Sequence, residues 1–163
     1  MLCFEKMVSL SIASCLKEMS VHFDSCSIDT PYEEALRIMC LSLSISIERL
    51  ICDKKVSLGD LVTKDLVLNL EKNFKRRCEQ EPFAYIKGQK AFLDHAFYVG
   101  PGVLIPRPET EHLVEFVSDY LQKRTESLST CLLLEFGFGS GIISLSLKKR
   151  FPELQVKAWD ISQ

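Results

Sequence analysis

The stretch that decides the fold reads Leu132-Leu133-Leu134-Glu135-Phe136-Gly137-Phe138-Gly139-Ser140-Gly141. It is an apolar run that ends in an acid, followed by three glycines at alternate positions and by the opening of an amphipathic helix. Glycine has no Cβ, so Gly137 and Gly139 allow a sharp turn and let a ligand approach the backbone. The amides that open the next helix carry partial positive charge. We therefore predict a strand–turn–helix corner suited to a nucleotide-like ligand.

An acid stands one strand–helix–strand unit further along the chain. Residues 131–136 are expected to form a buried strand, residues 140–150 a helix and residues 154–159 a second strand, and this alternation favours a parallel sheet. Asp160 follows the second strand, so it is predicted to lie beside the glycine loop at the carboxyl edge of the sheet. There its carboxylate can accept hydrogen bonds from the two vicinal hydroxyls of a ribose.

The glycine spacing favours one class of ligand but leaves alternatives open. Ile142 occupies the position where the dinucleotide fingerprint needs its third glycine. This favours a mononucleoside such as S-adenosylmethionine over NAD. An NAD-binding half-domain stays as an alternative, and so does a glycine turn that binds nothing, because close packing also selects glycine.

The first part of the chain, residues 1–80, is expected to be helical. A weakly amphipathic segment runs to about Met19, and Thr30-Pro31 followed by acids has the features of a helix start. Leu66, Leu70 and Phe74 are spaced by four and form an apolar stripe on another helix that ends near residue 77. Together these segments predict a unit of three or four helices.

The composition changes after Glu81-Pro82. Aromatic and β-branched residues gather between Phe83 and Val99, which predicts a short β-hairpin joining two domains, with its turn at Asp94-His95. A functional acid or base at His95 is the alternative to a solvated turn histidine. Prolines on both sides of Arg107 stiffen the backbone and hold this residue in a fixed place. Apolar residues over 113–121 then recur at helical spacing.

Charge and cysteine content exclude several classes of protein. The net charge of −2 provides no basic field for nucleic acid or an anionic membrane. The seven cysteines include no Cys-x-x-Cys pair, and we find no histidine near them in ligand spacing. We therefore expect free thiols in a reducing cytoplasm, with neither a disulfide framework nor a metal site. Signal-peptide features are missing and the uncharged runs are too short to span a bilayer, so the expected location is cytoplasmic.

Several motifs together resemble those of one known family. Residues 81–88 are similar to its "EP-x-AYI-x-G" segment, and residues 104–111 match its "LIPRPETE" loop. The glycine corner is similar to the family's first cofactor motif, and residues 158–162 are similar to its second. The chain thus resembles, in register along its length, the HemK-like N(5)-glutamine methyltransferases that modify peptide chain release factors and so act in translation termination.

The resemblance implies an α/β fold in three parts. Residues 1–80 would form a helical domain that docks the release factor, and residues 81–105 a β-hairpin linker. Residues 106–163 would form the first βαβ part of a class I, Rossmann-like methyltransferase domain that binds S-adenosylmethionine. The implied substrate is the glutamine side-chain amide of a Gly-Gly-Gln motif in the release factor. No metal, membrane or direct nucleic-acid partner is implied.

The resemblance also assigns site residues. Those expected to bind the cofactor are Glu135, Gly137, Phe138, Gly139, Ser140, Gly141 and Asp160, and those expected to border the substrate are Arg107, Pro108 and Glu109. In the family an Asn-Pro-Pro-Tyr tetrad positions the amide, and this tetrad does not occur in the 163 residues. No catalytic residue is therefore assigned.

The chain departs from the family pattern in ways that bear on its activity. Glu135 stands where the family usually has Asp, Phe138 places a ring in the cofactor loop, and Leu93-Asp94 replaces an aromatic residue and glycine in the hairpin. We expect a truncated form that is inactive alone. In this form the glycine loop and Asp160 are still expected to face one cofactor molecule. The alternative is a non-catalytic binding module that keeps the release-factor docking domain.

A sheet that has only its first strands leaves an edge and an apolar face uncovered. Ile142, Ile143, Leu145 and Leu147 could then not all be buried. We expect self-association, or disorder after about residue 130.

Overall fold

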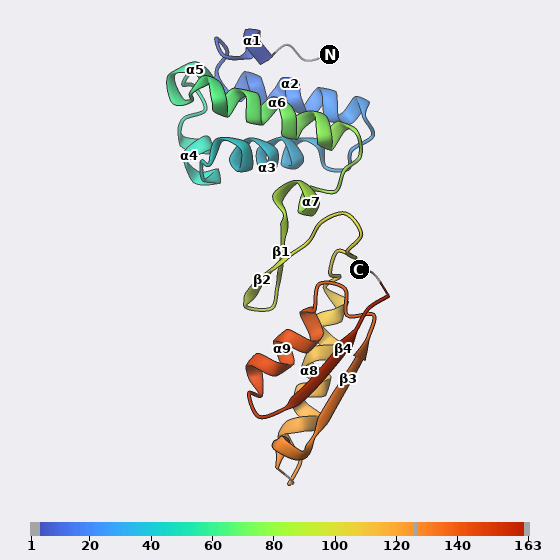
Figure 1. Ribbon diagram of the computed structural model, residues 1–163. Coiled ribbons are helices and arrows are strands. Elements are labelled where there is room, and N and C mark those ends of the chain that lie inside the picture. Colours follow the sequence, from blue (N-terminus) through green and yellow to red (C-terminus); the bar gives the residue numbers. More distant parts are fainter. Residues whose placement is uncertain (1–3, 126, 162–163) are drawn as a thin grey trace. The chain divides into compact units, whose positions relative to one another are not determined.

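The computed structural model of the chain describes residues 4–125 and 127–161 (Figure 1). The chain divides into two units, Met1–Ile86 and Lys87–Gln163, and each has its own apolar core. The segment 81–105, which the sequence analysis treats as a linker, is divided between them. Its hairpin packs within the second unit. Ser162, the last residue of the second cofactor motif, lies outside the described residues.

The first unit is a bundle built on three long helices. Its helices are α1 Phe4–Met7, α2 Ile12–Ser25, α3 Pro31–Leu43, α4 Ile47–Cys52, α5 Leu58–Leu61, α6 Lys64–Cys78 and α7 Phe83–Lys87, the last of which reaches the boundary. Helix α3 packs against both α2 and α6. Phe23 of α2 stacks on Phe74 of α6 with ring centroids 4.6 Å apart. The described residues of this unit are helical as expected, but they form six helices up to Cys78 where three or four were predicted, and Leu70 and Phe74 of the predicted stripe are buried.

The helix ends follow local chemistry, with two differences from expectation. Helix α2 is capped by Ser11, whose hydroxyl accepts a hydrogen bond from the Ser14 amide at 3.2 Å, and it continues past Met19 to Ser25. Helix α3 starts at Pro31 as predicted. However, Thr30 adopts a left-handed conformation with φ 49°, and its side chain makes no capping hydrogen bond.

A buried ion pair joins α3 to α6. The side chain of Glu34 is 7% exposed, and its carboxylate accepts hydrogen bonds from Arg77 Nε at 2.7 Å and Arg37 Nη1 at 3.0 Å. Because these donors occupy both oxygens, the carboxylate is compensated in a site that water scarcely reaches.

A β-hairpin opens the second unit. Strands β1 Gln89–Phe92 and β2 His95–Tyr98 pair antiparallel around a turn at Leu93-Asp94, so His95 begins β2. Phe92 and Phe97 are buried in the core of this unit. The predicted hairpin is shorter than the aromatic run that suggested it, because Phe83–Lys87 forms α7 instead of a strand. Pro82 suits the first turn of a helix, and its carbonyl accepts hydrogen bonds from the amides of Tyr85 and Ile86.

The remainder of the second unit is a strand–helix–strand arrangement preceded by a helix. Its elements are α8 Glu109–Gln122, the short 3-10 helix η1 Leu128–Thr130, β3 Leu132–Phe136, α9 Ile142–Arg150 and β4 Gln155–Trp159. Strands β3 and β4 are parallel, with Leu132 opposite Gln155 and Phe136 opposite Trp159. The predicted βαβ unit is confirmed. Helix α9 starts later than expected because Gly141, at φ 74°, occupies the cap position.

Within the described part of the chain, one face of the β3–β4 pair is covered and the other is not. Leu133 and Val156 pack into the same core as α8 and α9, which lie on one side of the strands (Figure 1). On the opposite face Leu134 is 50% exposed and Phe136 78% exposed, so the prediction that residues 131–136 form a buried strand is wrong for that face. The Phe136 and Trp159 rings stack there at 5.4 Å. As expected, the apolar residues of α9 are not all buried, since Leu145 is largely exposed.

Among the described residues, no helix has both the length and the apolar character needed to cross a membrane.

Candidate functional site

The loop between β3 and α9 turns back on the end of β4. The amides of Gly137 and Phe138 both donate to the Trp159 carbonyl, at 2.7 and 3.3 Å, and the Gly141 amide donates to the Phe138 carbonyl at 2.7 Å. The φ angles of Gly137, Gly139 and Gly141 are 74°, 52° and 74°. These left-handed conformations are open to glycine at no steric cost, so the three glycines allow this turn to form.

Two of these glycines also leave space above the backbone. A Cβ added to Gly137 or Gly139 would meet no atom within 4 Å outside the adjoining residues. Close packing within the described chain therefore does not explain why these two positions are glycine. At Gly141 close packing is part of the explanation, because an added Cβ would lie 3.1 Å from the Leu145 side chain.

Asp160 lies at the same corner. Its Oδ2 accepts a hydrogen bond from the Gly139 amide at 2.8 Å, so the acid and the glycine loop are in direct contact at the carboxyl edge of the strand pair. This is the placement that the spacing along the sequence predicted. A carboxylate can accept several hydrogen bonds at once, so this contact is compatible with further donors such as ribose hydroxyls.

Glu135 contacts the first turn of α9, which its place in the sequence did not predict. Its Oε2 accepts hydrogen bonds from the Ser144 amide at 3.0 Å and from the Ser144 hydroxyl. The carboxylate thus satisfies a donor in the first turn of α9, where negative charge is also favoured by the helix dipole. The sequence signal for this contact is a serine near the start of a helix that follows a strand ending in an acid.

A groove of about 400 Å³ begins at the loop and runs between α9 and β4. It is lined mainly by apolar surface, with Phe138, Ser140 and Gly141 at the loop end. The remaining lining residues are Ser144, Leu145 and Lys148 of α9 and Val156 and Ala158 of β4. Three of the seven residues expected to bind the cofactor line this groove, Gly139 and Asp160 contact each other, and Glu135 contacts Ser144 of the groove.

The three residues expected to border the substrate lie where α8 begins. Arg107, Pro108 and Glu109 are all exposed. The carbonyls of Arg107 and Pro108 accept hydrogen bonds from the amides of Thr110 and Glu111 at 3.1 and 3.0 Å, at the start of the helix. Glu111, which the sequence analysis left without a role, accepts a hydrogen bond from the Leu93 amide at 2.9 Å and so ties the hairpin turn to α8.

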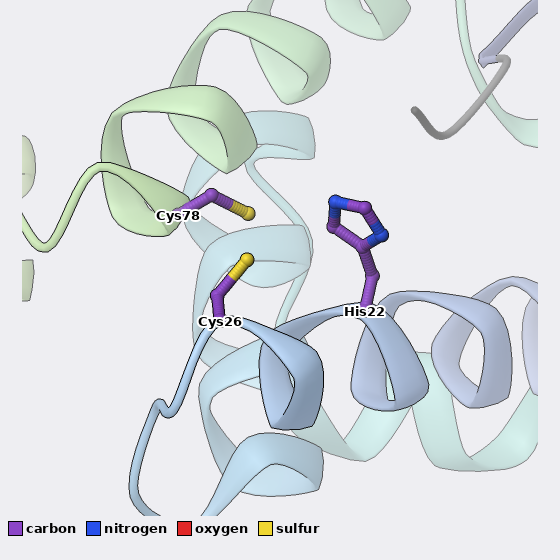
Figure 2. A group of neighbouring side chains, drawn as sticks. All are labelled: His22, Cys26 and Cys78. Carbon is purple, nitrogen blue, oxygen red and sulfur yellow. The ribbon is translucent and has the colours of Figure 1, made fainter.

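A second group of side chains with ligand chemistry lies in the first unit. Figure 2 shows His22 and Cys26 at the carboxyl end of α2 and Cys78 in the last turn of α6. Their ligand atoms all lie within 4.8 Å of one another. The statement that no histidine is near a cysteine in ligand spacing is therefore wrong, since His22 and Cys26 are four residues apart on one helix face. Burial, and then the neighbouring Cys26 thiol, raises the pKa of Cys78 to about 12, so this group is a thiol at neutral pH.

Comparison with known proteins shows what the chain is similar to. No protein-family model matches it. It is 32% identical over 156 residues to the release factor glutamine methyltransferase of Vibrio cholerae, a match that covers 94% of this chain and 51% of that protein. It is 42% identical over 101 residues to the release factor glutamine methyltransferase of Koribacter versatilis, covering 62% of this chain and 35% of the relative. A bifunctional methyltransferase of Rickettsia typhi is 32% identical over 167 residues, which cover 93% of this chain and 31% of that protein.

The chain is thus similar to several curated methyltransferases, and its α/β corner is compatible with that similarity. The chain spans between about a third and a half of the length of these curated relatives. More narrowly, it is a relative of the release factor glutamine methyltransferases, so the resemblance that its motifs suggested is confirmed.

Proposed function

We propose that the chain carries the cofactor-binding corner of an S-adenosylmethionine-dependent enzyme. This enzyme methylates the glutamine side-chain amide in the Gly-Gly-Gln motif of peptide chain release factors. The observation that carries the proposal is the 2.8 Å contact between the Gly139 amide and Asp160, which joins the two cofactor motifs at one sheet edge. The names of the relatives support a release factor as the substrate. The same corner supports a class I, Rossmann-like domain.

The residues of the corner fit this cofactor. The open backbone at Gly137 and Gly139 is suited to close approach by the methionine part, and Asp160 is suited to the ribose hydroxyls. Glu135 holds the first turn of α9 through Ser144 and is proposed to accept a hydrogen bond from the methionine amine. When bound, S-adenosylmethionine supplies a methyl group on a sulfonium centre.

Transfer to an amide nitrogen depends on positioning, because that nitrogen is a poor nucleophile. Arg107, Pro108 and Glu109 are exposed on a backbone stiffened by proline, which suits them to border a protein substrate. The Asn-Pro-Pro-Tyr tetrad that the resemblance assigns to amide positioning is not among the 163 residues. We therefore propose that this chain by itself binds cofactor without methyl transfer. Clear turnover with a release factor and labelled cofactor would contradict this.

Calorimetry tests the cofactor assignment. We expect S-adenosylhomocysteine to bind and NAD not to bind. Asp160→Asn removes the negative charge and should weaken binding about tenfold to a hundredfold, since hydrogen bonds to charged groups contribute about 1.5–3 kcal/mol. Asp29→Asn, an exposed acid in the first unit, is the matched control and should leave binding unchanged. Preferential binding of NAD, or unchanged affinity in Asp160→Asn, would overturn the assignment.

A second function, a non-catalytic binding module, is favoured by one observation. The first unit has its own apolar core, independent of the glycine corner. Capture of a release factor by the chain, with and without residues 1–80, separates the two functions. Capture that requires residues 1–80 and persists without cofactor and in Asp160→Asn would support the module.

A further inference from the structure

The His22, Cys26 and Cys78 cluster belongs to the first unit, whereas the residues proposed to bind cofactor belong to the second. Figure 2 shows the three side chains directed toward a common space between the ends of α2 and α6. Each is partly buried, so the cluster is shielded from bulk water but within reach of an ion.

The backbone that presents these side chains is held in several ways. The Cys26 amide donates to the carbonyls of His22 and Phe23, at 3.1 Å each, and the Ser25 hydroxyl donates to the His22 carbonyl at 2.6 Å. The Cys26 carbonyl accepts a hydrogen bond from Gln80 Nε2 at 2.6 Å, which links this turn to the segment just after Cys78. A site supported in this way by rigid elements is preorganised for a ligand.

The donor set is that of a borderline-soft metal ion. One imidazole and two thiolates are ordinary ligands of Zn²⁺, with bonds of about 2.0–2.1 Å to nitrogen and 2.3 Å to sulfur. Tetrahedral coordination at these lengths places ligand atoms roughly 3.6–3.8 Å apart. The atoms of the cluster lie within 4.8 Å of one another, so a shift of about one ångström by side-chain rotation closes the site.

We propose that His22, Cys26 and Cys78 form a zinc-binding site with three protein ligands, whose fourth position is taken by water. The two thiols lose their protons on binding, and no change of oxidation state is involved. The bound ion joins the carboxyl end of α2 to that of α6. Because only the folded first unit brings the three ligands together, zinc stabilises that unit by mass action.

A disulfide between Cys26 and Cys78 is the competing use of the two sulfur atoms. Such a disulfide does not involve the imidazole of His22, which faces the same space (Figure 2). The presence of three convergent ligands, including an imidazole that a disulfide does not need, favours the metal site.

Cobalt substitution provides the test. The reduced full chain is titrated with Co²⁺ and then with Zn²⁺, and thiolate-to-cobalt charge transfer is followed in the near ultraviolet. We expect one equivalent of Co²⁺ to produce this band and one equivalent of Zn²⁺ to remove it. Cys26→Ser and Cys78→Ser should each weaken binding more than tenfold, whereas Cys52→Ser, an exposed cysteine outside the cluster, should not. Zinc should raise the unfolding temperature of the unsubstituted chain and of Cys52→Ser only.

His22→Gln keeps both thiols and supplies a second variant, so the test does not depend on the folding of the cysteine variants. It should retain the helical circular dichroism spectrum and weaken Co²⁺ binding more than tenfold. Absence of the charge-transfer band in the reduced chain would overturn the proposal, and so would binding that none of the three cluster variants changes. A Cys26–Cys78 disulfide found by mass spectrometry in a chain that binds no Co²⁺ when reduced would assign the pair to redox chemistry instead.

Discussion

At the scale of single residues, the glycines of the corner have a conformational and a spatial role that can be separated. Gly137 has φ 74° and Gly88 has φ 73°, and an added Cβ would meet no atom within 4 Å outside the adjoining residues at either position. The two glycines are therefore matched in backbone strain and in local space. Only Gly137 lies in the proposed ligand site.

Gly137→Ala and Gly88→Ala should each lower the free energy of unfolding by about 1 kcal/mol, because alanine is strained in the left-handed region. Only Gly137→Ala should also weaken binding of S-adenosylhomocysteine, since its methyl group projects into the space above the loop. Urea denaturation measures the first effect and calorimetry the second. Equal affinities in the two variants would argue against ligand approach at Gly137.

The buried carboxylate of Glu34 provides a second prediction. Glu34→Gln leaves the guanidinium of Arg77, whose side chain is only 15% exposed, without its charge partner. Breaking a buried pair in this way costs about 3 kcal/mol or more. The neighbouring exposed acid is the control, and Glu33→Gln should change the free energy of unfolding by less than about 0.5 kcal/mol. A loss of similar size in both variants, measured by urea denaturation, would contradict the assigned role of Glu34.

At the scale of the elements, local sequence patterns predicted the type of each segment, helix or strand, better than they predicted which of its side chains are exposed. The apolar run 131–136 does form a strand, but Leu134 and Phe136 are exposed because a second layer does not cover that face in the described residues. The aromatic run after Pro82 favoured a strand, yet the proline starts a short helix there. An apolar run does not determine whether another layer of the protein covers it. It also does not determine whether a nearby helix-start residue, such as Pro82, makes the segment helical.

The end of α6 is held by an ion pair whose pH dependence is predictable. Arg76 donates two hydrogen bonds to Glu81, at 2.7 and 2.6 Å, and this lowers the pKa of the Glu81 carboxyl from its ordinary value of 4.5. A lowered pKa contributes stability that is present above the ordinary value and is lost as the pH falls through the lowered one.

Glu81→Gln should therefore lower the unfolding temperature at pH 7, by an amount that corresponds to at most about 1 kcal/mol for a partly exposed pair. The difference from the unsubstituted chain should shrink as the pH falls well below 4.5. Thermal unfolding between pH 7 and pH 2.5 measures it. Glu71→Gln, at an exposed position of the same helix, should show no such convergence. A difference that stays constant with pH would rule out the ion pair as its source.

At the scale of the whole molecule, the uncovered face of the strand pair governs behaviour in solution. Leu134, Phe136 and Trp159 are 50%, 78% and 47% exposed and lie on the same face of adjacent parallel strands. Contiguous exposed apolar surface of this kind favours association.

We expect the chain to self-associate at micromolar concentration, and the double variant Leu134→Thr with Phe136→Thr to shift it toward monomer without loss of strand propensity. Sedimentation velocity measures the shift. Val21→Thr removes a single exposed apolar residue from α2 and should leave the association unchanged. A monodisperse monomer whose amides are protected from exchange through residue 159 would contradict the prediction.

The sequence by itself determined the helical character of the first unit, the parallel strand–helix–strand unit and the meeting of Asp160 with the glycine loop. These follow from periodicity, from helix-start residues and from the geometry of a single βαβ unit, all of which act over short stretches of chain. Only the tertiary structure decided that Glu34 meets Arg77, that Cys78 joins His22 and Cys26, and that Leu134 and Phe136 are the exposed residues of the strand predicted to be buried. The physical reason is that such contacts depend on how separate helices and layers pack, which local pattern does not specify.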